Sequence, residues 1–139
     1  MDMQFIQENI LLVGLAVVSG AMLLWSFLGG KVSGVASVDT LEATRLINQD
    51  ALVLDVREDK EFVAGHIPKA RHIPLGALAS RLGELEKFKN KPIVVNCRSG
   101  QRSARACGIL KKHGFEKAVN LTGGIMAWES ANLPVEKKA

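Results

Sequence analysis

The sequence predicts an α/β domain with a mostly parallel sheet that is covered by helices on both faces. Short runs of apolar, β-branched residues, which are typical of buried strands, alternate with segments whose apolar residues follow helical spacing. Strands that are joined through helices run parallel in such a domain. Ligands of these sheets bind at the carboxyl ends of the strands, so the residues that directly follow each predicted strand are the first candidates for a site.

Five strands and the helices between them are expected from the apolar spacing. The strands are expected at 35–38, 51–54, 70–73, 92–95 and 118–121. The helices are expected over 40–48, 58–64, 75–88 and 103–112, and in a short segment that ends at Trp128. Asp39 and Glu42 have the spacing of a capping box, in which Glu42 reaches back to the capping residue. Gly83 is expected to interrupt the leucine-rich helix over 75–88.

The N-terminal part of the chain differs from the rest. No charged residue occurs from Ile10 to Leu28, a stretch of 19 residues that is close to the roughly 20 that cross a bilayer as a helix. Trp25 and Phe27 near its end suit an interfacial position. We therefore expect a transmembrane helix over 10–28, after a short segment at 1–9, with the lipid bilayer as its partner. A cleaved signal peptide is the main alternative, but it would begin with basic residues, which are missing here.

The charges predict an orientation and the kind of ligand. All 18 Lys and Arg residues lie from Lys31 onward, which predicts a single-pass protein with its N-terminus outside and its domain in the cytoplasm. The same part holds 12 of the 14 acidic residues, a net charge of +6 that suits anionic ligands. We see no nucleic-acid motif, and two cysteines without paired spacing argue against a disulfide scaffold or a zinc site. A linker is expected at 29–34, the domain at 35–133 and a solvated tail at 134–139.

One polar stretch directly follows a predicted strand and opens a predicted helix: Asn96-Cys97-Arg98-Ser99-Gly100-Gln101-Arg102-Ser103. Such a loop points several backbone N–H groups at one spot, and the helix terminus adds positive potential. Arg98 and Arg102 add two full charges. These features lower the pKa of a thiol, so we interpret Cys97 as a reactive thiolate and the loop as a pocket for an anionic substrate. Cys107 lies on the apolar face of the following helix and is expected in the core.

Four stretches together resemble the motifs of the rhodanese family, the thiosulfate sulfurtransferases and related persulfide carriers. They are Leu-Val-Leu-Asp-Val-Arg at 52–57, Glu-Phe-x-x-Gly-His-Ile-Pro-x-Ala at 61–70, the cysteine loop at 97–103, and Leu-Thr-Gly-Gly-x-x-Ala-Trp at 121–128. The likeness runs from about Val38 to Leu133, which is nearly the whole predicted domain. It implies a three-layer α/β/α sandwich on a five-stranded parallel sheet, and membrane-anchored members of this single-domain kind exist.

The resemblance also implies a mechanism. Cys97 attacks the outer sulfur of a small anionic donor, such as thiosulfate or a persulfide, and an acceptor thiol, or cyanide in the standard assay, removes that sulfur from the Cys97 persulfide. Arg98 or Arg102 would hold the donor. The persulfide-binding loop comprises Arg98, Ser99, Gly100, Gln101, Arg102 and Ser103. No cofactor and no metal are expected.

The remaining residues of the motifs are interpreted as structural. Asp55 and Arg57 are expected to form an ion pair or hydrogen-bonded unit that supports the site. His66 and His72 are expected as loop residues rather than general bases. Gly123, Gly124 and Trp128 are expected to shape the fold.

Two alternatives stay open. A related branch of the fold hydrolyses phosphate esters or reduces arsenate, with a C-x5-R loop that fits a tetrahedral oxyanion. Here Cys97 and Arg102 form a C-x4-R loop, one residue shorter and shaped for a single sulfur atom, which favours sulfur transfer. The other alternative is a membrane-tethered binding module without turnover. Inactive members usually lack the cysteine, whereas Cys97 is present. The sequence names neither a physiological donor or acceptor nor a protein partner.

Overall fold

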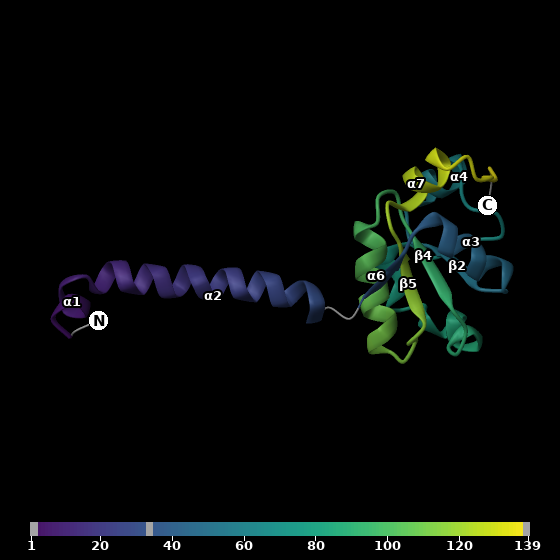
Figure 1. The fold of residues 1–139 in the computed structure, drawn as a ribbon. Coiled ribbons are helices and arrows are strands. Elements are labelled where there is room, and N and C mark those ends of the chain that lie inside the picture. The colour runs from purple at the N-terminus through teal and green to yellow at the C-terminus, as the bar shows by residue number, and fades with distance from the viewer. Residues whose placement is uncertain (1–2, 33–34, 138–139) are drawn as a thin grey trace. The chain divides into compact units, whose positions relative to one another are not determined.

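The computed structural model describes residues 3–32 and 35–137, and of residues 26–32 it describes the backbone alone. The chain divides into two compact units, residues 1–34 and 35–139 (Figure 1). All strands of the described residues belong to the second unit, which is therefore the α/β domain.

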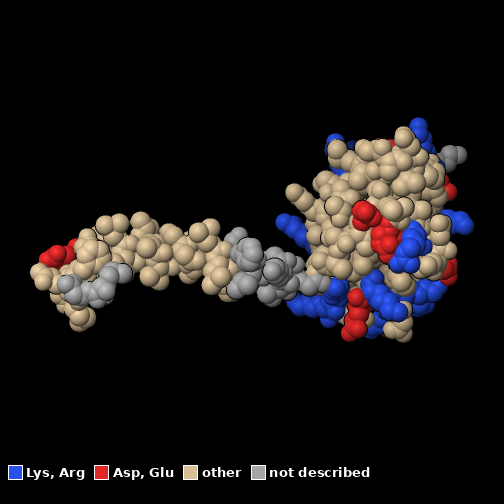
Figure 2. Space-filling model, viewed as in Figure 1, with Lys and Arg blue, Asp and Glu red and all other residues tan. Residues whose placement is uncertain are grey.

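The N-terminal unit consists of two helices, α1 (Met3–Glu8) and α2 (Ile10–Val32). From Ile10 to Trp25, most large apolar side chains of α2 are exposed. Residues 3–25 include no Lys or Arg (Figure 2). Among the described residues, no helix combines the length and the apolar character that crossing a membrane requires. The predicted transmembrane helix over 10–28 is therefore not supported.

The boundaries at the ends of the chain also differ from those predicted. Helix α2 begins at Ile10 but continues past Leu28 to Val32, so residues 29–32 of the predicted linker are helical. A glycine destabilises a helix by only about 1 kcal/mol, and Gly29 and Gly30 do not end this one. Residues 33–34 of the predicted linker lie outside the described residues, as do 1–2 of the predicted N-terminal segment and 138–139 of the predicted tail.

The domain is built on a parallel five-stranded sheet, as predicted. Its strands are β1 (Ala36–Val38), β2 (Leu52–Asp55), β3 (Arg71–His72), β4 (Ile93–Asn96) and β5 (Ala118–Leu121). Their order is β1-β5-β4-β2-β3, and every neighbouring pair is parallel. All four residues of β4 are buried, because this strand lies at the centre with helices over both of its faces.

Two layers of helices cover the sheet. The helices are α3 (Thr40–Asn48), α4 (Asp59–Ala64), α5 (Leu75–Leu78), α6 (Gln101–Lys112) and α7 (Gly124–Ser130), with a 3-10 helix η1 (Leu82–Phe88). On one face α5, η1 and α6 form a core cluster with β4 that includes Leu78, Leu85, Ile93, Val95 and Leu110. On the other face α3 and α7 form a cluster with β2 and β4 that includes Ala43, Val53, Val94, Ile125 and Trp128. Figure 1 shows α6 and α3 on opposite sides of the sheet.

Three local predictions are corrected. Asp39 caps α3 by accepting the N–H of Glu42 at 2.8 Å, but the Glu42 side chain binds Arg45 instead of reaching back. The segment 75–88 is not one helix interrupted at Gly83, because α5 ends at Leu78 and Gly83 lies inside η1. Helix α6 begins at Gln101, two residues before its predicted start.

Candidate active site

The carboxyl ends of three neighbouring strands bring polar residues to one edge of the sheet. The register pairs Asp55 of β2 with Asn96 of β4, and it pairs Val95 of β4 with Asn120 of β5. Cys97 directly follows β4, and α6 begins four residues later. Gly100 caps that helix with φ of +105°, a left-handed conformation that glycine adopts at little cost. The chain therefore turns tightly around the Cys97 side chain.

The Cys97 sulfur is surrounded by hydrogen-bond donors of its own loop. The N–H of Gly100 donates to Sγ at 3.0 Å, and Oγ of Ser103 lies 3.3 Å from Sγ. Burial by itself would raise the pKa of the Cys97 thiol, but the Ser103 hydroxyl and the backbone N–H groups of Ser103, Gly100 and Ser99 outweigh it, so the pKa is lowered. The loop therefore stabilises a negative charge on this sulfur.

Cys107 has the opposite environment. It is buried in the apolar cluster beneath α6. Burial raises the pKa of its thiol to about 12, and the charge of Lys111 only partly offsets this effect. Cys107 therefore stays protonated at neutral pH, as expected of a core cysteine.

The first turn of α7 binds the backbone of the loop. Ile125 donates its N–H to the Cys97 carbonyl at 2.8 Å, and Met126 donates to the Arg98 carbonyl at 3.2 Å. Gly124 makes this contact possible, because its φ is +56° and a Cβ there would collide with the carbonyl of Cys97 and with Arg98. Gly123, with φ of +75°, precedes the helix. The two glycines thus shape the candidate site as well as the fold.

Asn120 belongs to the site although it was not among the residues predicted for it. Its Nδ2 donates to the Gly100 carbonyl at 3.1 Å, and its Oδ1 accepts from Oγ of Ser103 at 2.5 Å. Both partners are residues of the cysteine loop. A polar residue inside a predicted buried strand, next to the cysteine strand in the sheet, was the one signal that pointed to it.

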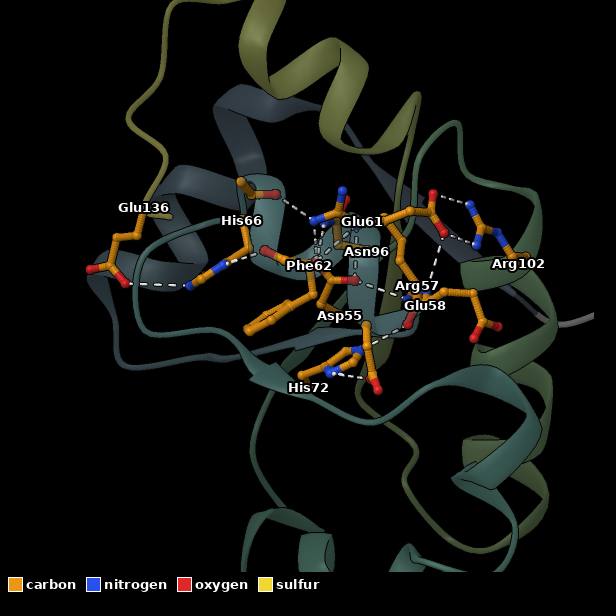
Figure 3. Close-up of polar contacts among 12 residues, drawn as sticks. Asp55, Arg57, Glu58, Glu61, Phe62, His66, His72, Asn96, Arg102 and Glu136 are labelled. Atoms are coloured by element: carbon orange, nitrogen blue, oxygen red, sulfur yellow. Dashed lines mark hydrogen bonds and ion pairs between the residues drawn. The ribbon is translucent and has the colours of Figure 1, made fainter. Parts of the chain in front are cut away.

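Arg102 does not face the site as a free cation. Its guanidinium binds both carboxylate oxygens of Glu61 in α4, at 2.7 and 2.9 Å (Figure 3). This pairing lowers the pKa of the Glu61 carboxyl to about 2 and raises that of Arg102. The Arg102 charge is therefore compensated by Glu61 in this structure, and the expectation that Arg102 holds an anionic donor stays a prediction. The Arg98 side chain is exposed and has no ion-pair partner among the described residues.

A buried ion pair lies below the loop. Arg57 donates from Nη2 to Oδ2 of Asp55 at 2.8 Å and to the carbonyl of Gly65 at 2.7 Å. Nδ2 of Asn96 lies 3.4 Å from the same Asp55 oxygen, which ties the residue before Cys97 to the pair (Figure 3). Asp55 and Arg57 thus join β2, β4 and the end of α4. Among the described residues, neither side chain forms a hydrogen bond with Cys97.

The two histidines are held by other partners. Their rings stack on either side of Phe62, with centroid distances of 3.8 Å for His66 and 4.4 Å for His72. Nδ1 of His66 bonds to the Phe62 carbonyl, and Nε2 of His72 bonds to the Arg57 carbonyl. His66 also pairs with Glu136 through two backbone hydrogen bonds, so the segment predicted as a solvated tail is attached to the domain at this residue.

The other loop residues, Ser99 and Gln101, have exposed side chains. Ser99 contributes its backbone N–H to the sulfur, and Gln101 begins α6. Within residues 3–32 and 35–137, no three His, Cys, Asp or Glu side chains are grouped so that they would hold a metal ion. What the arrangement provides is one buried sulfur with several donors aimed at it.

Known proteins share this architecture. A model of the rhodanese-like domain family matches residues 39–131. A sulfurtransferase of Allochromatium vinosum is 38% identical over 87 residues, which are 63% of this chain and 79% of that protein. The thiosulfate sulfurtransferase GlpE of Pseudoalteromonas translucida is 32% identical over 97 residues, 70% of this chain and 89% of that one. The crystal structure of a rhodanese-related protein from Thermoplasma volcanium has a TM-score of 0.68 at 32% identity and covers 74% of this chain and 99% of its own. With its cysteine loop at the end of the central strand, this chain belongs to the family of rhodanese-like domain proteins.

Proposed function

We propose that the protein is a sulfurtransferase that carries a sulfane sulfur on Cys97. The observation that supports this most is the set of donors around one sulfur atom, the N–H of Gly100 and the hydroxyl of Ser103 together with the amides that lower the pKa of the thiol. A thiolate that is formed at neutral pH and held by fixed dipoles is a ready nucleophile. The two relatives named as sulfurtransferases agree with this chemistry.

The proposed reaction has two steps, transfer of sulfur to Cys97 and transfer from Cys97 to an acceptor. The Cys97 thiolate attacks the outer sulfur of thiosulfate, the S–S bond of the donor breaks, and sulfite leaves with the electron pair. The outer sulfur of the resulting persulfide carries the negative charge. A thiolate acceptor, or cyanide, then attacks that outer sulfur, takes it away as a persulfide or thiocyanate, and leaves Cys97 as the thiolate. No net oxidation of the protein occurs, and no metal is required by this sequence of steps.

The donor is proposed to be a small anion that Arg98 receives. Arg98 directly follows the nucleophile and is exposed, whereas the charge of Arg102 is compensated by Glu61. An unpaired guanidinium binds oxyanion groups with charge-assisted hydrogen bonds. Thiosulfate fits this description, and so does the carboxylate end of a small organic persulfide.

Sulfur transfer is tested directly by mass spectrometry. The purified protein is incubated with thiosulfate, and a gain of one sulfur atom on the Cys97 peptide, removed again by cyanide with release of thiocyanate, is expected. The same preparation is offered an aryl phosphate. Hydrolysis of the ester faster than sulfur transfer would assign the site to the phosphatase branch, and neither activity would leave a binding module as the better description.

The cellular placement of the domain stays a prediction of the sequence. It rests on the lack of Lys and Arg before Lys31 and on the positive-inside bias. Protease added to intact cells is expected to leave the domain undigested, and cell fractionation reports whether the full chain sediments with membranes. Digestion from outside would reverse the predicted orientation.

A further inference from the structure

The hydrogen bonds around Cys97 form a closed ring that includes a residue of another strand. Sγ of Cys97 accepts from the Gly100 N–H, and the Gly100 carbonyl accepts from Nδ2 of Asn120. Oδ1 of Asn120 faces Oγ of Ser103, and the same Oγ faces Sγ of Cys97, which closes the ring. Cys97, Ser103 and Asn120 are all buried. Solvent therefore does not supply alternative partners, and the protein groups compete among themselves.

The orientation of the Asn120 amide follows from its partners. A carbonyl oxygen accepts and does not donate, so the Gly100 carbonyl requires the NH₂ group of Asn120 on its side. The Asn120 oxygen is thereby turned toward Ser103, where it is an acceptor only. Oγ of Ser103 lies 2.5 Å from Oδ1 of Asn120 and 3.3 Å from Sγ of Cys97. Because sulfur is the larger atom, both acceptors are within hydrogen-bonding reach of this hydroxyl.

A serine hydroxyl has one hydrogen to donate, and here two acceptors face it. A neutral thiol sulfur is only a weak acceptor, so while Cys97 is a thiol the hydrogen is expected to go to the Asn120 oxygen. When Cys97 becomes a thiolate, the sulfur becomes the stronger acceptor, because hydrogen bonds to charged groups are about twice as strong as neutral ones. The Ser103 hydroxyl can then donate to the sulfur only if its hydrogen bond to Asn120 is broken.

We propose that Asn120 is a positioning residue that competes with the Cys97 sulfur for the single hydroxyl hydrogen of Ser103, so that the hydroxyl rotates between the two acceptors as the sulfur gains and loses charge. In the persulfide the charge moves to the outer sulfur, and the hydroxyl returns to Asn120. The inference rests on the proposed function only in taking Cys97 as the reacting group.

The direction of the effect separates this role from simple support of the loop. Without the Asn120 acceptor, the Ser103 hydroxyl serves the thiolate alone, so Asn120→Ala is expected to lower the pKa of Cys97 by about one unit. Thiolate-dependent alkylation then becomes up to about tenfold faster at a pH below that pKa. If Asn120 merely held the loop through Gly100, its loss would misplace the amide donors and raise the pKa instead.

The experiment measures alkylation of the full-length protein by iodoacetamide across pH, read at the Cys97 peptide so that Cys107 does not contribute. Ser103→Ala is expected to raise the pKa, and the double variant Ser103→Ala/Asn120→Ala is expected to match Ser103→Ala, because there is no hydroxyl left to compete for. Thr122→Ala, an exposed change just beyond the same strand, is the control and is expected to leave the pKa unchanged. Circular dichroism checks that each variant is folded.

A second variant covers the case in which Asn120→Ala does not fold. Asn120→Asp keeps the volume and offers Ser103 a stronger acceptor, so it is expected to raise the pKa of Cys97, and to do so less when Ser103 is Ala. A pKa raised by Asn120→Ala, or an Asn120→Asp shift of equal size with and without the Ser103 hydroxyl, would overturn the proposal. Because the titration needs no sulfur donor, it stays informative even if sulfur transfer is not observed.

Discussion

The two cysteines differ in reactivity because different groups face their sulfur atoms. Both are buried, so burial alone would keep both protonated. The loop donors outweigh burial at Cys97, whereas Cys107 lies in an apolar cluster where the charge of Lys111 only partly offsets the effect of burial. Burial by itself therefore says little about a thiol, and the donors within reach of the sulfur decide its charge.

A pair of serine substitutions tests this difference. Cys97→Ser is expected to abolish sulfur transfer while the fold survives, because a serine hydroxyl is a far poorer nucleophile at neutral pH. Cys107→Ser is expected to keep the activity and to lower the free energy of unfolding by about 1–3 kcal/mol, because a hydroxyl is buried among apolar groups. Thiocyanate formation and urea unfolding measure the two effects. Activity retained by Cys97→Ser, or lost in folded Cys107→Ser, would contradict the assignment.

Glu61 controls how much positive charge the loop presents. The Arg102 guanidinium is compensated by this carboxylate, so Glu61→Gln is expected to release a cation beside the nucleophile and to lower the KM for thiosulfate several-fold. Arg98→Gln is expected to raise that KM. Steady-state kinetics with thiosulfate measure both changes. If Glu61→Gln left KM unchanged while Arg102→Gln raised it, Arg102 would bind the donor despite its ion pair.

The same ion pair predicts a pH dependence of stability. The pKa of Glu61 lies at about 2 in the folded protein, below its ordinary 4.5, so its contribution is present above pH 4.5 and is lost as the pH falls through 2. The side chains are 30% and 34% exposed, and solvent screening limits the contribution to about 1 kcal/mol. Acid unfolding of Glu61→Gln is expected to lack this component. Identical acid unfolding curves for the two proteins would show that the pair adds nothing.

At the residue scale, the sequence predicts contacts between chain neighbours but not contacts between residues that are far apart along the chain. Cys97 stands out because its neighbours in the chain supply both the turn and the donors. Glu61 lies 41 positions from Arg102, and Asn120 lies 17 positions from Ser103. Such contacts depend on strand order and helix placement, which the apolar pattern leaves open. The sequence therefore points to Cys97 and the donors of its loop, but not to Glu61 and Asn120, which contact that loop from other elements.

At the scale of elements, a short helix holds the backbone of the loop. The first turn of α7 binds the carbonyls of Cys97 and Arg98, and only a glycine at position 124 allows this approach. Of the local patterns, the strands are recognised best because their apolar runs are continuous. The leucine spacing over 75–88 misleads because Leu78 and Leu85 are both buried although they belong to separate helical pieces.

Two glycine substitutions test the support that α7 gives. Gly124→Ala is expected to displace the loop, lower sulfur transfer strongly and reduce the free energy of unfolding by about 1–3 kcal/mol or more, because its φ is positive and its Cβ would meet the Cys97 carbonyl. The control, Gly108→Ala, lies inside α6 with open space around its Cβ and is expected to stabilise the protein by about 0.5–1 kcal/mol. Equal behaviour of the two variants would argue against the role given to Gly124.

At the scale of the whole molecule, every residue of the candidate site belongs to the second compact unit. The C-terminal segment is part of that unit too. Glu136 exchanges two backbone hydrogen bonds with His66, and Nε1 of Trp128 donates to the Pro134 carbonyl at 2.8 Å. Composition predicted a solvated tail here, because a charged segment with one proline gives no sign of a partner that lies 70 positions earlier in the chain.

Two truncations separate these parts. A protein that begins at Val35 is expected to fold and to transfer sulfur with the kcat/KM of the full chain, because every residue of the candidate site belongs to the second unit. A protein that also ends at Leu133 loses the hydrogen bonds of Pro134 and Glu136, and its free energy of unfolding is expected to fall by about 1–3 kcal/mol while the loop still reacts. Urea unfolding and the thiocyanate assay measure both. If removal of the N-terminal helices reduced kcat/KM in a folded domain, the first unit would contribute to catalysis. The site would then not be confined to residues 35–137.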